Sequence, residues 1–286
     1  MYYGLIILSV VMFGGNFALN DVYRRLRGSS LRISLEFSLV GAVVGVIFLF
    51  CINGFHLTTT PFTILMAFLS TLNGLAFTFC GFRALGLINL SLYSLFSMLG
   101  GMLLPFLQGI LFFGEDFTLA KGVCLLFICA ALLLTVEKGE KKKGTVYYVG
   151  IFLLNGLSGV ISKIFVSAPF AKGSATDFSI WSAILSLALC GILLLAFFRK
   201  KEAPKNTPLS LGINALGSGI NRVANLILVL ALAHVDASVQ YPMVTGGVMI
   251  VSTLLCYFGK NKPSPRELLS ISLAFLGMLA LFVIPI

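Results

Sequence analysis

The chain has 286 residues, of which 58% are hydrophobic and only 10% are charged, and its mean hydropathy is +1.04. Because roughly a quarter of the residues in an ordinary soluble domain are charged, this composition excludes a water-soluble fold. The net charge of +10 comes from short clusters of Lys and Arg between apolar segments, and no basic domain is present. We therefore expect the lipid bilayer to be a partner and expect no nucleic acid.

Apolar segments long enough to cross a bilayer follow one another along the whole sequence. A hydrocarbon core about 30 Å thick requires about 20 apolar residues per helix. This pattern predicts an all-α membrane protein of ten transmembrane helices, at about residues 3–20, 31–52, 62–85, 90–113, 118–136, 147–165, 178–198, 209–231, 235–258 and 268–286. The first span lacks a basic leader, so we expect it to be retained as a helix.

The distribution of cations predicts an orientation in the plasma (inner) membrane. With ten spans, 16 of the 20 Lys and Arg residues lie on the side reached after the odd-numbered helices. By the positive-inside rule this side is cytoplasmic, which places both termini outside. The six cysteines lie in or beside apolar spans without paired spacing, so we expect no metal and no cofactor.

The two halves of the sequence resemble each other. An offset of 147 aligns Thr60-Pro61 with Thr207-Pro208, and an offset of 146 aligns Gly100-Gly101 with Gly246-Gly247. We interpret residues 1–143 and 144–286 as two five-helix repeats. Because five is odd, the second repeat enters the membrane from the opposite side, which gives the inverted repeats found in many secondary transporters.

The block from Arg83 to Val136 resembles the ten-helix, EamA-type members of the drug/metabolite transporter superfamily. It contains Pro105 within the fourth span and Gly114-Glu115 after it, and the second copy has Ser252 and Lys260 at the matching positions. Gly14-Gly15-Asn16-Phe17 resembles the family's first helix, although the Trp usual there is absent. The resemblance implies a basket of ten helices around a central cavity, lined largely by helices 1, 3, 4, 6, 8 and 9, and transport by alternating access.

Polar residues within the eighth span are the strongest candidates for a substrate site. Asn214, Ser218, Asn221 and Asn225 are spaced four, three and four residues apart, so they share one helix face, with Arg222 beside it near mid-membrane. A guanidinium at this depth requires an anion or several carbonyls. Arg222 therefore either binds a carboxylate or phosphate of the substrate or forms an internal structural contact.

Glu36 is the acidic residue that lies within a predicted span. Its i, i+4 spacing from Arg32 favours an interfacial ion pair, and the alternatives are proton coupling or pairing with Arg222.

Weaker polar positions occur on other helices, and each either lines the path or only packs between helices. The candidates are Asn16, Asn73, Asn155, Tyr93, Ser97, Gln240, Tyr241 and Trp181.

No nucleophile with a base, acid pair or phosphate-binding loop stands out, so the sequence favours a transporter over an enzyme. We expect secondary-active transport of a small polar metabolite that is amino-acid-like or carries a carboxylate. The alternatives are export of a cationic or drug-like compound and, as a rival class, an intramembrane enzyme. The sequence leaves the oligomeric state open, a monomer included.

Overall fold

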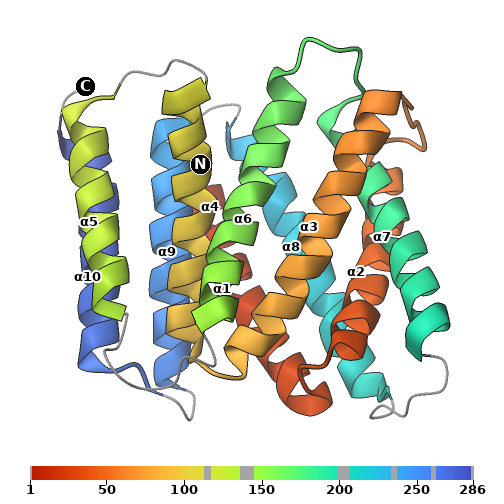
Figure 1. Cartoon of the computed structure of the whole chain (residues 1–286), viewed down its shortest axis with the longest axis horizontal. Helices are drawn as coiled ribbons and strands as arrows, with labels where there is room; N and C mark the ends of the chain where they lie inside the picture. Colours follow the sequence, from red (N-terminus) through yellow and green to blue (C-terminus); the bar gives the residue numbers. More distant parts are fainter. Residues whose placement is uncertain are drawn as a thin grey trace.

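The computed structural model describes residues 2–112, 117–135, 145–198, 206–232, 237–258 and 262–284, apart from the side chains of residues 106, 132, 135, 229–230, 232, 237–242 and 281–282. The described residues form ten α-helices and no strand (Figure 1). The helices are α1 (Tyr2–Arg27), α2 (Leu31–Ile52), α3 (Pro61–Leu85), α4 (Leu90–Phe112), α5 (Leu119–Thr135), α6 (Thr145–Ser167), α7 (Ala175–Phe198), α8 (Pro208–Leu232), α9 (Ala237–Tyr257) and α10 (Pro265–Val283). Each of the ten segments predicted from hydropathy therefore coincides with a helix.

Local sequence signals set several of the helix ends. Thr60 accepts a hydrogen bond from the backbone N–H of Thr63, and Pro61 follows it at the first helical position of α3. Ser264 and Glu267 form a reciprocal capping box at the start of α10. α1 ends at Gly28, whose φ of 96° lies in the left-handed region that favours glycine.

Six of the described helices are long and apolar enough to cross a membrane: α1, α2, α3, α4, α6 and α7. Two shorter apolar stretches, Leu119–Ala131 and Met243–Tyr257, belong to α5 and α9. Large apolar side chains such as Ile47, Leu126 and Leu195 are exposed on the outside of the bundle. An outer surface this apolar suits a bilayer rather than water.

Helices that follow one another in the chain run in opposite directions. On α1, Ser9 donates to the carbonyl of Ala224 and Asn16 faces Gly217, so α1 and α8 are antiparallel. Similar contacts show which other packed pairs run parallel: α1 and α9, α3 and α7, and α4 and α6. The antiparallel pairs are α2 and α7, α3 and α6, and α5 and α10. Odd-numbered helices thus run one way and even-numbered helices the other.

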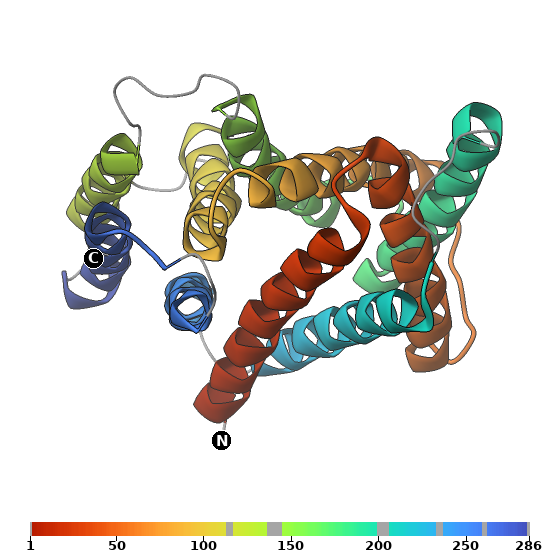
Figure 2. The ribbon, with the colours of Figure 1, turned by 90° about the horizontal axis from the view of Figure 1, so that it is seen from below.

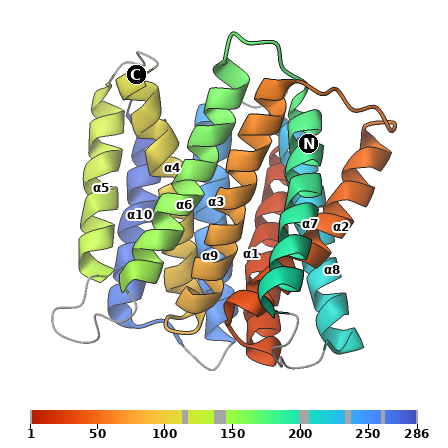
Figure 3. The same ribbon diagram turned by 45° about the vertical axis from the view of Figure 1, so that its right-hand side comes forward.

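The helices form two groups joined by α1 and α6. One group contains α2, α3, α7 and α8, and the other contains α4, α5, α9 and α10, at opposite ends of the long axis (Figures 1, 2 and 3). α1 packs on α8 of the first group and on α9 of the second, while α6 packs on α3 and on α4. Each group combines helices from both halves of the chain.

Candidate functional site

Arg222 lies near the middle of α8, and its guanidinium rests against α2 at Gly45. A Cβ added at Gly45 would come within 2.8 Å of the Arg222 Nη2 atom and within 3.2 Å of Cζ. One turn earlier, a Cβ at Gly41 would lie 3.0 Å from the hydroxyl of Ser218. Two glycines four residues apart on α2 therefore leave room for two polar side chains four residues apart on α8.

The guanidinium of Arg222 has no hydrogen bond and no ion pair with any residue that the structure describes. Each ion pair among the described residues lies instead near the junction of α1 and α2 and involves Asp21 or Glu36. A guanidinium carries five donors and a charge that an apolar environment does not solvate. Arg222 is thus chemically suited to bind an anionic group.

The remaining polar residues of α8 differ in what they contact. Asn214 is buried and donates to the carbonyl of Phe37 on α2, and Ser218 donates to the Asn214 side-chain oxygen at 3.3 Å. Asn225 is exposed and donates to the backbone and side-chain oxygens of Asn221. The predicted stripe is therefore present, and its first two members join α8 to α2.

Asn16 of α1 approaches α8 from the other side. It is buried, and its Oδ1 atom would lie 3.0 Å from a Cβ at Gly217. Because Gly217 has no side chain, α1 and α8 can approach closely at this point.

A second cluster of predicted residues joins α3, α4 and α6. Asn73 of α3 donates from Nδ2 to the carbonyl of Leu154 at 2.9 Å, and Asn155 donates from Nδ2 to the carbonyl of Ser97 on α4 at 2.6 Å. Asn73 and Ser97 are buried, and the Asn73 Oδ1 and Ser97 Oγ atoms have no hydrogen-bond partner in the part of the chain that the structure describes. We call Asn73, Ser97 and Asn155 the α3–α4–α6 cluster.

The structure describes two of the predicted aromatic residues, Tyr93 and Trp181. Tyr93 of α4 is buried, packs edge-on against Phe17 at 5.2 Å between ring centroids, and places its hydroxyl beside Gly81. Trp181 of α7 has a buried Nε1 atom without a partner among the described groups. The side chains of Gln240 and Tyr241 lie outside the described residues.

Glu36 is held at the end of the bundle where α1 ends and α2 begins. Its carboxylate accepts hydrogen bonds from the guanidinium groups of Arg32, at 2.9 Å, and Arg27. Arg32 also donates to the carbonyl of Phe198 at the end of α7. Glu36 lies nine residues before Gly45 on α2, so about 13 Å of helix separates it from the level of Arg222.

Asp177, in the first turn of α7, is a buried acid that the span assignment missed. Its carboxylate accepts from the side chain of Asn53 at 3.2 Å, from the backbone of Thr58 at 3.1 Å, and from the backbone and hydroxyl of Ser174 at 2.8 Å. The network ties α7 to the loop between α2 and α3. The Ser174-x-x-Asp177 spacing of a capping box was the available sequence signal.

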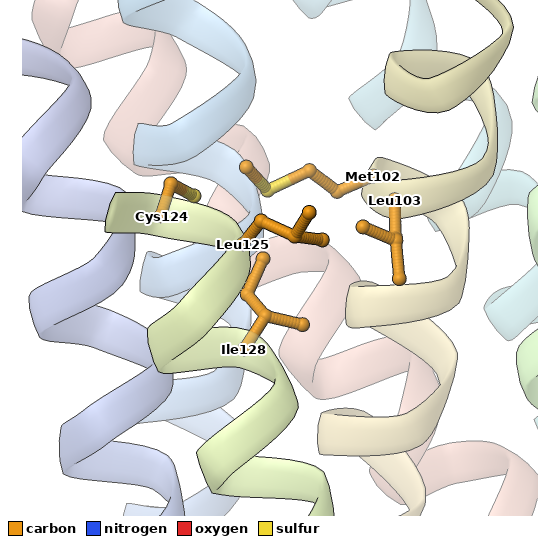
Figure 4. A pocket seen from close by; sticks show the side chains of 5 residues that line it. All are labelled: Met102, Leu103, Cys124, Leu125 and Ile128. Carbon is orange, nitrogen blue, oxygen red and sulfur yellow. The ribbon is translucent and has the colours of Figure 1, made fainter. Parts of the chain in front are cut away.

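Two hollows in the described structure lie away from the predicted site residues. One lies between α4 and α5 and is lined by Met102, Leu103, Cys124, Leu125 and Ile128, whose side chains face one another across the two helices (Figure 4). The other is an open groove of about 550 Å³ between α3 and α7, lined by residues such as Ile64, Phe68 and Leu185. Both linings are largely apolar, so neither hollow offers groups for a polar solute.

Metal ligands do not cluster in the described part of the chain: no group of three or more His, Cys, Asp or Glu residues there could hold an ion.

Comparison with known proteins supports the fold and leaves the family open. No protein-family model matches the chain, and no curated protein matches it. A solved structure described only as "Crystal structure of protein" is similar, with a TM-score of 0.62 and 20% identity over 96% of this chain and 94% of that chain. At this identity the likeness concerns the fold alone. Membership of the drug/metabolite transporter superfamily stays a prediction.

Proposed function

We propose that the chain is a secondary-active transporter of the plasma membrane that moves a small polar metabolite carrying a carboxylate, by alternating access. Arg222 carries this proposal. It is a guanidinium without a described partner, near the middle of a helix whose neighbours are apolar segments of membrane-spanning length. Such a group in a bilayer marks a binding or transport pathway by default, and its planar fork suits a carboxylate.

The helix packing supports an inverted repeat and ten crossings. If α1–α5 and α6–α10 are two repeats, each helix of the first corresponds to the helix five positions later. The α1–α8 contact then corresponds to α6–α3, the α1–α9 contact to α6–α4, and the α2–α8 contact to α7–α3. All six of these contacts occur. α2–α7, α4–α9 and α5–α10 each correspond to themselves and also occur. Two halves related in this way can exchange conformations and open a shared site to either side.

The alternating helix directions support the proposed orientation. Most described cations lie where odd-numbered helices end or even-numbered helices begin: Arg24, Arg25, Arg27, Arg32, Arg83, Lys262 and Arg266. Lys121, Lys163 and Lys172 belong to the opposite end. We assign the arginine-rich end to the cytoplasm, which leaves both termini outside.

Transport into proteoliposomes tests the proposal. The purified protein should take up labelled carboxylates with saturation and should show counterflow, which a channel does not. Arg222→Gln should reduce carboxylate uptake at least about tenfold, because a charge-assisted pair of guanidinium and carboxylate stabilises binding more than one neutral hydrogen bond does. Arg222→Lys, which keeps the charge, should retain more activity, and Arg83→Gln, at the end of α3, is the matched control.

The outcome against the proposal is a folded Arg222→Gln variant that transports every carboxylate as the unsubstituted protein does. Saturable uptake of cationic or drug-like compounds, without uptake of carboxylates, would favour the alternative exporter. Chemical conversion of the added compound would favour an enzyme.

A further inference from the structure

The α3–α4–α6 cluster contains two buried oxygen atoms, Asn73 Oδ1 and Ser97 Oγ, that have no hydrogen-bond partner among the described residues. Asn73 is 6% exposed and Ser97 is fully buried. The Asn73 side-chain amide donates to the carbonyl of Leu154, and the backbone carbonyl of Ser97 accepts from the side chain of Asn155. Leu154 and Asn155 are consecutive along α6. α3 and α4 both pack on α6 and also touch each other. The two unpaired oxygens therefore belong to one junction of three helices, near the middle of α3 and α6.

Most other buried hydroxyl groups in the described bundle donate to a backbone carbonyl, and an exception is Ser91 at the start of α4. Ser94, one turn before Ser97, donates to the carbonyl of Ser91 at 2.8 Å, and Ser252 of α9 donates to the carbonyl of Val248 at 2.7 Å. A serine in a helix can usually reach the carbonyl three or four residues earlier. The Ser97 hydroxyl makes no such bond, so it remains free for a partner that the described residues do not supply.

The chemistry of these atoms selects the partner. The Asn73 Oδ1 atom can only accept a hydrogen bond, and the Ser97 hydroxyl can accept one as well. No charged residue takes part in the hydrogen bonds of the cluster. The Asn73 oxygen therefore suits an N–H donor and disfavours a carboxylate, and the Ser97 hydroxyl can accept a hydrogen bond from the same donor.

We propose that Asn73 and Ser97 bind the N–H-bearing end of the transported molecule, a primary ammonium or amide. This inference rests on the proposed function and narrows its substrate to carboxylates that also carry an N–H group. Asn73 lies on α3, in one group of four helices, and Ser97 lies on α4, in the other. A single bound N–H donor would therefore contact both groups of helices.

Matched ligand pairs separate the amine from the carboxylate. L-Phenylalanine against 3-phenylpropanoate and L-leucine against 4-methylpentanoate differ only in the amino group. The unsubstituted protein should bind the amino member about tenfold more tightly, because a buried oxygen left unpaired disfavours the other member. Ser97→Ala should shrink this ratio several-fold, whereas Ser94→Ala should leave it unchanged.

The thermal stability of the ligand-free protein gives a second test, in which Ser97→Ala and Ser94→Ala should change the Tm in opposite directions or by different amounts. Ser97→Ala removes an unpaired hydroxyl, so the apparent Tm of the ligand-free protein should stay the same or rise. Ser94→Ala removes a satisfied hydroxyl and should lower it. A ligand-free Ser97→Ala protein that melts at lower temperature than Ser94→Ala would show that the hydroxyl is already bonded, for instance to water, and would overturn the proposal.

The failure of this inference is distinguishable from the failure of the proposed function. Equal affinity for both members of every pair overturns the amine subsite and leaves carboxylate transport standing. If no carboxylate binds, the proposed function fails, and the subsite is tested with phenethylamine, which should raise the Tm of the unsubstituted protein more than that of Ser97→Ala. Equal shifts in the two proteins would then overturn the subsite too.

Discussion

The contact between α4 and α6 yields the sharpest prediction for stability. A Cβ added at Gly100 would lie 2.0 Å from the carbonyl oxygen of Phe152 and 2.6 Å from its carbonyl carbon. Because these are backbone atoms, no side chain can rotate away. Restoring an ordinary contact of about 3.5 Å requires the two helices to separate by about 1.5 Å, which also opens their neighbouring contacts.

We expect Gly100→Ala to lower the free energy of unfolding by about 3 kcal/mol, the upper part of the range for overpacking. Gly15→Ala on α1 is the matched control, because a Cβ there meets nothing within 4 Å; its effect should stay within about 0.5 kcal/mol. Unfolding of the detergent-solubilised variants in a denaturant series measures both values. Equal stabilities of the two variants would refute the close backbone contact.

Three other substitutions test the polar contacts. Gly45→Ala should displace the Arg222 guanidinium and weaken carboxylate binding about threefold to tenfold. The loss of stability should be small, because the added methyl group meets only the end of the flexible Arg222 side chain. Gly219→Ala is the binding control, since a Cβ there meets nothing within 4 Å. Glu36→Gln should destabilise the protein by about 1–3 kcal/mol, because the guanidinium of Arg27 keeps its charge and loses its carboxylate partner, and urea unfolding would show this. Asp177→Ala should cost about 2 kcal/mol and speed proteolysis between α2 and α3; unchanged cleavage would contradict the role of this network.

Hydropathy predicted the helices well because each span must bury its own backbone polar groups in an apolar environment. It placed the ends less well. The first span was expected to end near residue 20, whereas α1 continues to Arg27 through a polar last turn. Asp177 was missed for the same reason, since a polar first turn lies outside an apolar window although its side chain is buried.

Helical periodicity identified which residues share a face but not which helix covers that face. Asn214 and Ser218 contact α2, whereas Gly217, one residue before Ser218, contacts α1. The choice between α1 and α2 depends on the packing of segments far apart in the chain. For the same reason the sequence could not pair Arg222 with Gly45, which only becomes notable once the two helices are side by side.

α1 and α6 hold the two helix groups in different ways. Toward α9 and α4 they make close glycine contacts, such as Gly14 against Val251 and Gly156 against the backbone of Gly100. Toward α8 and α3 the glycine contacts are wider, 3.0 Å at Gly217 and 3.1 Å at Gly150. Single side chains also reach across there, as Ser9 does to the carbonyl of Ala224. The closer glycine contacts tolerate little displacement, while one hydrogen bond can be exchanged. We therefore expect α1 and α6 to move with α4, α5, α9 and α10 during the proposed transport cycle.

Two engineered disulfides separate these interfaces. Cys80 of α3 faces Gly150 of α6, with 3.5 Å between its Cβ and a Cβ built at Gly150, and Val10 of α1 faces Gly247 of α9 at the same separation. Both distances suit a disulfide. With the other cysteines removed, Gly150→Cys should cross-link to Cys80 and stop transport until a reductant is added. The Val10→Cys, Gly247→Cys pair should form its disulfide and leave transport intact, because that interface does not open. The reverse pattern would place the moving interface between α1 and α9, where the closer glycine contacts lie.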